Sequence, residues 1–156
     1  MCKGITPTIQ VMDRTPTSDV EFARVKGPTC FGGCTELCCD QPFNVKRVNK
    51  DGNVSVEYGD IATITKRKPS SMTGALREML TDSDTYTLSV HDPSVPPQQR
   101  ATLIGTLLLM DYMFFERDID MCGVDNGKFY VNICNCYMCG CVCPCQLKQG
   151  GGGGGN

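Results

Sequence analysis

One continuous apolar run, from Ala101 to Phe115, constrains the fold of this chain more than any other feature. It reads ATLIGTLLLMDYMFF, follows the charged Arg100 and ends before Glu116. A helix that crosses a bilayer needs roughly 20 apolar residues, and this run is shorter. Its apolar residues fall on every face of a helix, so we expect the helix to be buried. The burial is either in a protein core or, with tilt or local thinning of the bilayer, in a membrane.

Composition gives few further constraints. The 156 residues carry a formal net charge of −2, which predicts no general attraction to nucleic acid, so we expect no nucleic-acid partner. The N-terminal MCKGITP lacks the apolar core of a secretory signal, and the twelve cysteines are then expected to be reduced in the cytosol. We expect a folded domain over residues 1–120, a cysteine-rich tail over 121–149 and a glycine-rich disordered tail over 150–156.

The first two thirds of the chain is typical of β-structure. The sequence KDGN at 50–53 predicts a hairpin turn. Short alternating or β-branched runs predict strands at Thr8–Met12, Val20–Val25, Phe43–Val48, Asn53–Tyr58, Ile61–Lys66 and Lys128–Ile133. Together these features predict a mainly β domain in which a sheet or barrel closes over one apolar helix.

Several local strings resemble one protein family. Gly74–Glu78 (GALRE), Thr81–Tyr86 (TDSDTY) and Gly105–Glu116, with its DYMFFE ending, are similar to the C-terminal half of the phospholipid scramblases. Gly27-Pro28 and Cys39–Phe43 (CDQPF) fit the same family. The resemblance covers roughly residues 7–116, so we expect the chain to begin near the middle of the family domain. The implied fold is a partial tubby-like β-barrel around a C-terminal central helix.

The resemblance also implies an activity. Scramblases move phospholipids between leaflets in both directions, without ATP and in response to Ca²⁺, so the chain is not expected to be an enzyme. We expect it at the cytosolic face of the plasma membrane, with membrane phospholipids as partners. A single short helix offers no polar groove across a bilayer, so a homo-oligomer is expected as well. The alternatives are an acylated adaptor that binds other proteins, in the nucleus when it is not acylated, a non-functional fragment, and a thiolate metal binder.

Asp82, Asp84 and Asp92 are the candidate calcium ligands. They lie where the resemblance places the calcium loop of the family, and Ca²⁺ takes six to eight oxygen ligands. Counted from Asp82, the loop lacks the glycine and the final glutamate of a helix-loop-helix calcium site. We therefore expect weak affinity, on the order of 10⁻⁴–10⁻³ M. The alternative is a capped polar turn.

Lys66, Arg67 and Lys68 form a candidate basic patch. Near an anionic membrane such charges contribute about 1 kcal/mol each, and the family has a segment here that resembles a nuclear-import signal. The alternative is a solvated strand end.

The cysteines form two groups, one in a glycine-rich loop and one in the CNCYMCGCVCPC stretch. Cysteines beside apolar residues are expected targets of S-acylation, and two acyl chains, such as palmitate, anchor a protein stably. A soft metal held by thiolates and an unmodified tail are the alternatives. The candidates are Cys38, Cys39, Cys134, Cys136, Cys139, Cys141, Cys143 and Cys145.

The apolar run supplies the candidate membrane-contacting residues. They are Leu103, Leu107, Asp111, Phe114 and Phe115. Asp111 is expected either to hydrogen-bond within the fold or to lie on a lipid path, and we favour the structural role.

Overall fold

The computed structural model describes residues 5–14, 18–49, 51–54, 59–71, 73, 84–115, 121–138 and 140–149. Several features named above therefore lie outside the described residues: Gly74–Glu78, Asp82, Cys139 and the glycine-rich segment 150–156.

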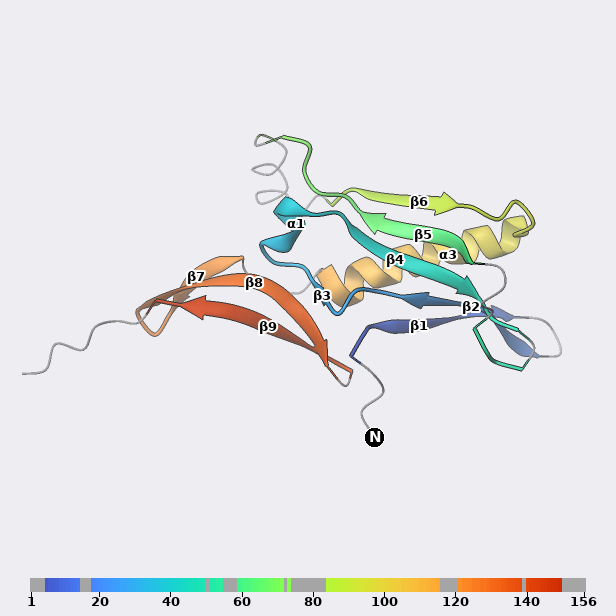
Figure 1. The fold of residues 1–156 in the computed structure, drawn as a ribbon, viewed down its shortest axis with the longest axis horizontal. Helices are drawn as coiled ribbons and strands as arrows, with labels where there is room; N and C mark the ends of the chain where they lie inside the picture. Colours follow the sequence, from blue (N-terminus) through green and yellow to red (C-terminus); the bar gives the residue numbers. More distant parts are fainter. Residues whose placement is uncertain are drawn as a thin grey trace, which may run out of the picture.

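A five-stranded antiparallel sheet forms the centre of the molecule (Figure 1). Its strand order is β1-β2-β4-β5-β6. The strands are β1 (Thr8–Arg14), β2 (Asp19–Lys26), β4 (Gln41–Arg47), β5 (Asp60–Lys66) and β6 (Tyr86–Val90). The order follows the sequence, with β3 left out, as is common because consecutive strands usually lie next to each other.

Alternation along the strands gives this sheet one apolar face. In β4, Phe43 and Val45 are buried and Asn44 is exposed. In β5, Ile64 and Lys66 lie on the buried face, and Thr63 and Thr65 alternate with them. Successive side chains of a strand point to opposite faces, so one face is available to pack against a helix.

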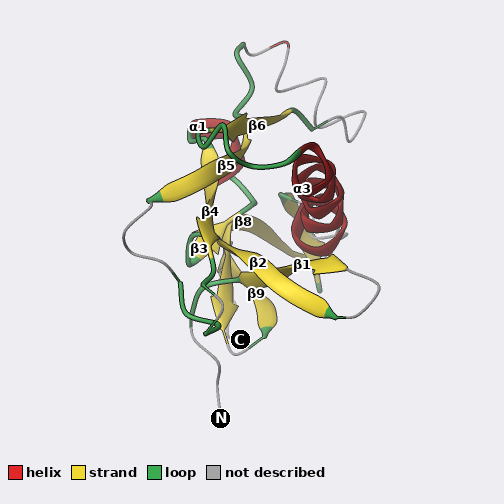
Figure 2. Ribbon diagram, turned by 90° about the vertical axis from the view of Figure 1, so that its right-hand side faces the viewer, coloured by secondary structure: helices red, strands yellow, loops and turns green. Residues whose placement is uncertain are grey.

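The long helix α3 (Pro97–Met110) covers the apolar face of the sheet (Figure 2). Pro97 lies in its first turn, where a missing N–H costs nothing. Leu103 and Met110 are fully buried against the sheet. Pro96 precedes the helix in extended conformation, so the chain enters α3 directly after a turn.

A π-helical turn, η1 (Asp111–Phe115), ends the helix. This wider turn brings two consecutive aromatic residues, Phe114 and Phe115, against Phe31 and Phe43. The ring centroids of Phe31 and Phe114 are 5.4 Å apart in an edge-to-face arrangement, which is favourable for aromatic pairs. These rings fix the end of the helix to the sheet.

A second, four-stranded sheet lies beside the first and contains the cysteine-rich segment (Figure 1). It consists of β3 (Cys30–Phe31), β7 (Cys122–Asp125), β8 (Lys128–Met138) and β9 (Cys141–Lys148). The segment 121–149, expected as a tail, thus forms a β-meander, and its strand β8 pairs with β3 of the N-terminal half. A short helix, α1 (Thr35–Cys38), follows β3.

The predicted fold class, mainly β with one apolar helix, is confirmed. The two sheets do not close into a barrel over the described residues, so only part of a barrel is present. The hairpin turn is confirmed in its described part by the bridge between Val48 and Val54 and by Gly52, whose φ is +75°. Of the strand predicted at Asn53–Tyr58, residues 55–58 lie outside the described residues.

Candidate functional site

The outer face of α3 and η1 carries several exposed large apolar side chains. Ile104, Leu108 and Tyr112 are 54%, 63% and 71% exposed, and Leu109 and Met113 lie beside them, 47% and 43% exposed. Residues four apart stack along one side of a helix, so these side chains form a continuous stripe. A contiguous exposed apolar patch of this kind marks a surface that contacts a partner or a membrane. We call these five residues the outer face.

Four of the candidate membrane-contacting residues lie on the opposite side of the helix, and Asp111 has the structural role favoured for it. Leu103 and Phe114 are buried, and Leu107 and Phe115 pack against the core. Asp111 accepts a hydrogen bond from the hydroxyl of Tyr86 at 2.7 Å, and it is therefore part of the packing between the helix and β6. Among the described residues, the sheet covers one face of the apolar run.

The Tyr86–Asp111 hydrogen bond is largely shielded from water. Burial, together with this hydrogen bond, raises the pKa of Tyr86 well above its ordinary value. The phenol therefore stays protonated and donates to Asp111 at neutral pH. This contact joins β6 to the end of the helix.

Lys66 is not part of an exposed basic patch, contrary to the prediction for this position. Only 5% of it is exposed, and its ammonium group is paired with Glu36 and, at 2.6 Å, with Asp84. The same group lies 4.2 Å above the ring of Phe115. A buried ammonium group needs such partners, so Lys66 connects α1, β5, the start of β6 and η1.

Arg67 and Lys68 remain at the surface. The guanidinium of Arg67 is 2.8 Å from Asp40, and the Lys68 ammonium lies near the carbonyl of Cys38 at 3.4 Å. The patch expected from three adjacent charges is therefore reduced to two partly neutralised ones.

Asp84 and Asp92 do not lie close enough to share one calcium ion. The five-residue strand β6 separates them, and at about 3.3 Å per residue that strand alone spans about 13 Å. Two ligands of one Ca²⁺ lie no more than about 5 Å apart. The predicted loop forms a strand because Tyr86, Leu88 and Val90 alternate with polar residues and pack on the core.

Each of the two carboxylates has another partner. Asp84 is paired with Lys66 at 2.6 Å, and Asp92 with Arg47 at 2.7 Å. Hydrogen bonds from Ser94 and Arg47 lower the pKa of Asp92 to about 2. Asp92 therefore belongs to a turn that follows β6 and not to a calcium site shared with Asp84.

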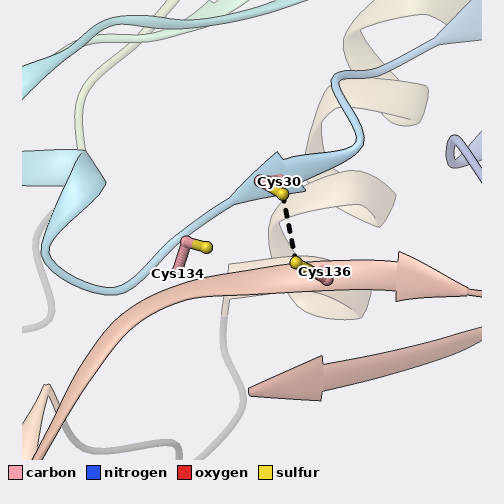
Figure 3. A group of neighbouring side chains, drawn as sticks. All are labelled: Cys30, Cys134 and Cys136. Atoms are coloured by element: carbon pink, nitrogen blue, oxygen red, sulfur yellow. Dashed lines mark hydrogen bonds between the residues drawn. The ribbon is translucent and has the colours of Figure 1, made fainter. Parts of the chain in front are cut away.

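Cysteine thiols gather where β3, β8 and β9 meet. The sulfur atoms of Cys30, Cys134 and Cys136 all lie within 4.8 Å of one another, and Figure 3 shows Cys30 and Cys136 facing each other across the two strands. The Cys136 sulfur is 3.0 Å from that of Cys30 and 3.0 Å from that of Cys145. Each of these cysteines is free.

The crowding of the thiols changes their acidity. Burial, together with the Cys145 neighbour, raises the pKa of Cys134 to about 11. Hydrogen bonds with Cys145 and Cys30 raise the pKa of Cys136 further. With no metal bound, Cys134 and Cys136 therefore stay protonated at neutral pH.

The other cysteine candidates are separate and accessible. Cys38 and Cys39 are exposed at the end of α1, and Cys141 and Cys143 are exposed on β9. The structure therefore divides the candidates into single exposed thiols and a clustered group.

Sequence reasoning missed the outer face and the place of Cys30. The run from Ala101 to Phe115 is apolar on every face, so its periodicity could not tell which side packs on the sheet. Cys30 joins the thiol cluster through pairing between strands more than a hundred residues apart, for which the sequence carries no local signal.

Comparison with known proteins assigns the chain to a family. No helix of the described part is long and apolar enough to cross a membrane. No solved structure matches the chain. The Scramblase family model matches residues 10–117, which include the five-stranded sheet, β3, α1, α3 and η1. The chain therefore belongs to the Scramblase family.

Proposed function

We propose that this protein moves phospholipids between the leaflets of a bilayer without ATP, and that the outer face of α3 is the surface that enters the membrane. The observation that carries the proposal is the exposed stripe of Ile104, Leu108 and Tyr112 on the helix of a scramblase-family domain. Exposing such an apolar surface to water costs free energy, and contact with lipid acyl chains removes that cost.

The dimensions of the helix favour insertion along the interface over a span. The 14 residues of α3 extend about 21 Å at 1.5 Å per residue, against roughly 30 Å for the hydrocarbon core. An amphipathic element in the interface buries its apolar face about 5–10 Å deep. Inserted in this way, α3 displaces lipid from one leaflet and thins the bilayer locally, which lowers the barrier for a head group to cross.

Calcium dependence is the finer part of the proposal. The family resemblance supports it, and Asp84 is the first described carboxylate of the expected calcium loop. Its partner Lys66 would have to give way to the ion, which would loosen the contact between β6, α1 and η1. Calcium would in this way release the end of α3 toward the membrane.

Acylation is proposed for the exposed cysteines only. Cys38, Cys39, Cys141 and Cys143 are accessible to an acyltransferase. Two or more acyl chains give stable anchoring where a single chain does not. Anchoring at the cytosolic leaflet would hold the outer face near the bilayer.

Lipids would move in both directions, because no energy source sets a direction for their transfer.

A dithionite assay on proteoliposomes tests the proposal. Vesicles with a fluorescent head-group lipid are prepared with and without the full chain, and the fraction of lipid that dithionite reduces is followed over time. The proposal predicts reduction beyond the outer-leaflet half when protein is present, faster with Ca²⁺ than with a chelator. Folded, vesicle-bound protein that leaves the inner leaflet protected would refute it.

Two variants separate scrambling from its calcium dependence. Asp84→Asn is expected to abolish the stimulation by Ca²⁺, and because it also removes the ion pair with Lys66 its rate without Ca²⁺ is expected to be at least that of the wild type. Asp125→Asn, which removes a carboxylate paired with Lys148 on the second sheet, is the matched control and is expected to respond to Ca²⁺ like the wild type. Equal stimulation of all three proteins would exclude Asp84 as a calcium ligand.

A further inference from the structure

The pairing of the second sheet places six cysteines on one face. Directly opposite residues of antiparallel strands point to the same side, and the pairs are Cys30 with Cys136, Cys134 with Cys145, Cys136 with Cys143 and Met138 with Cys141. The alternating residues Phe31, Tyr137 and Val142 pack on the core. The cysteines therefore occupy the side of the sheet that faces away from the core.

Four of these thiols approach one another closely. Cys136 lies in the middle, with the sulfur of Cys30 at 3.0 Å on the β3 side and that of Cys145 at 3.0 Å on the β9 side. Cys134 lies within 4.8 Å of both Cys30 and Cys136, and its side chain also interacts with Cys145. Figure 3 shows Cys30, Cys134 and Cys136 as one group between β3 and β8.

We propose that Cys30, Cys134, Cys136 and Cys145 form a zinc site that joins β3 to the hairpin of β8 and β9. Structural Zn²⁺ sites are commonly tetrahedral with four thiolates, and a Zn–S distance of about 2.3 Å places two such sulfurs about 3.8 Å apart. The sulfurs of Cys30, Cys134 and Cys136 already lie within 4.8 Å of one another, and the sulfur of Cys145, 3.0 Å from that of Cys136, must move closer to the other two to complete the tetrahedron.

The donor set also selects the class of metal. Sulfur ligands bind soft or borderline ions such as zinc, whereas calcium requires oxygen. Each thiol that binds gives its proton to solvent, and the four thiolates and Zn²⁺ form a closed site with no open position for catalysis. The site is therefore structural, and it is separate from the calcium dependence proposed above.

The proposed zinc site connects two parts of the chain. Cys30 belongs to the region matched by the family model, and the other three ligands lie beyond residue 117, where that match ends. Zinc would thus fasten the cysteine-rich hairpin to the scramblase-family domain, and four of the cysteines would no longer be available for acylation.

Metal content of the full chain tests the proposal. The protein is expressed with added zinc, purified under a phosphine reductant without chelator, and analysed by mass spectrometry of the elements and of the native protein. The expected result is about one zinc per chain. Replacement by Co²⁺ is expected to give the intense thiolate-to-cobalt band of a tetrahedral sulfur site.

Three variants make the test specific. Cys136→Ser and Cys30→Ser are expected to lower zinc occupancy at least tenfold, and Cys30→Ser is the safer of the two for folding because its side chain is exposed on a two-residue strand. Cys122→Ser, an exposed cysteine of β7 outside the cluster, is expected to keep the metal.

Two outcomes would overturn the proposal. One is folded wild-type protein that retains no zinc, whether its thiols are reduced or peptide mapping finds a Cys30–Cys136 disulfide. The other is zinc that remains in both Cys136→Ser and Cys30→Ser.

Discussion

Replacing Lys66 by methionine tests whether the buried ammonium group holds the end of the helix to the sheet. Methionine keeps much of the length and the apolar stem but removes the charge between Glu36 and Asp84. Breaking a buried ion pair on one side costs about 3–5 kcal/mol. The two carboxylates keep 22% and 24% of their side-chain surface exposed and can be partly rehydrated, so we expect a loss of about 2–4 kcal/mol of unfolding free energy.

Urea denaturation followed by circular dichroism measures this loss. For a domain of this size it corresponds to a decrease in Tm of about 5–15 °C. Lys46→Met is the matched control, because Lys46 pairs with Asp60 at 3.7 Å and is 42% exposed. We expect the control to change the unfolding free energy by less than about 1 kcal/mol.

A second variant distinguishes the loss of electrostatic attraction at Lys66 from the loss of side-chain packing. Lys66→Met combined with Glu36→Gln and Asp84→Asn removes all three charges, and replacing a buried ionic group by neutral residues of similar shape is often nearly neutral. We expect this triple variant to recover most of the loss. If Lys66→Met and Lys46→Met destabilise the protein equally, the reasoning about the buried charge is refuted.

Three further predictions follow from the packing around the helix. Tyr86→Phe leaves the Asp111 carboxylate without its donor and should lower the unfolding free energy by about 1.5–3 kcal/mol; an unchanged midpoint in urea would contradict the hydrogen bond. Phe31→Ala empties a fully buried ring site and should cost about 3–5 kcal/mol in the same assay, whereas a loss below about 1 kcal/mol would contradict the aromatic packing. Because the folded pKa of Asp92 is about 2 and the unfolded value is about 3.9, its stabilising effect is present above about pH 4 and is lost as pH falls toward 2. A carboxyl NMR titration should show this midpoint, and it should move upward in Ser94→Ala; a midpoint near 4 in the wild type would contradict the predicted shift.

Much of the first sheet was predictable from alternation. The buried faces of β1, β2, β4 and β5 follow directly from apolar residues spaced two positions apart in the sequence. The apolar run predicted the helix. The same rule placed Lys66 on the buried face, since it follows Ile64 by two residues. Its position in a KRK cluster at the end of a strand suggested solvent exposure instead.

The strand β6 was missed because its polar opening residues resemble a calcium loop. The pattern of Tyr86, Leu88 and Val90 nevertheless has a strand period of two.

The proposed zinc cluster shows a different limit of prediction from sequence. The spacing of Cys134 and Cys136 places both on one face of a strand, but only tertiary pairing brings Cys30 to them. Local pattern does not determine such long-range pairing.

A lipid-scrambling assay of the Leu108→Glu variant tests most directly the claim that the outer face of α3 enters the membrane. Leu108 is 63% exposed on the outer face, and Leu147 is 67% exposed on β9, so Leu147→Glu is a matched control. The substitution removes a leucine from lipid and adds a negative charge near anionic head groups. Together these two changes weaken the free energy of vesicle binding by about 2–3 kcal/mol. This corresponds to a 30-fold or greater loss of vesicle binding. We predict that scrambling falls with binding in Leu108→Glu and is unchanged in Leu147→Glu. Wild-type scrambling by Leu108→Glu would contradict the claim that the outer face of α3 enters the membrane.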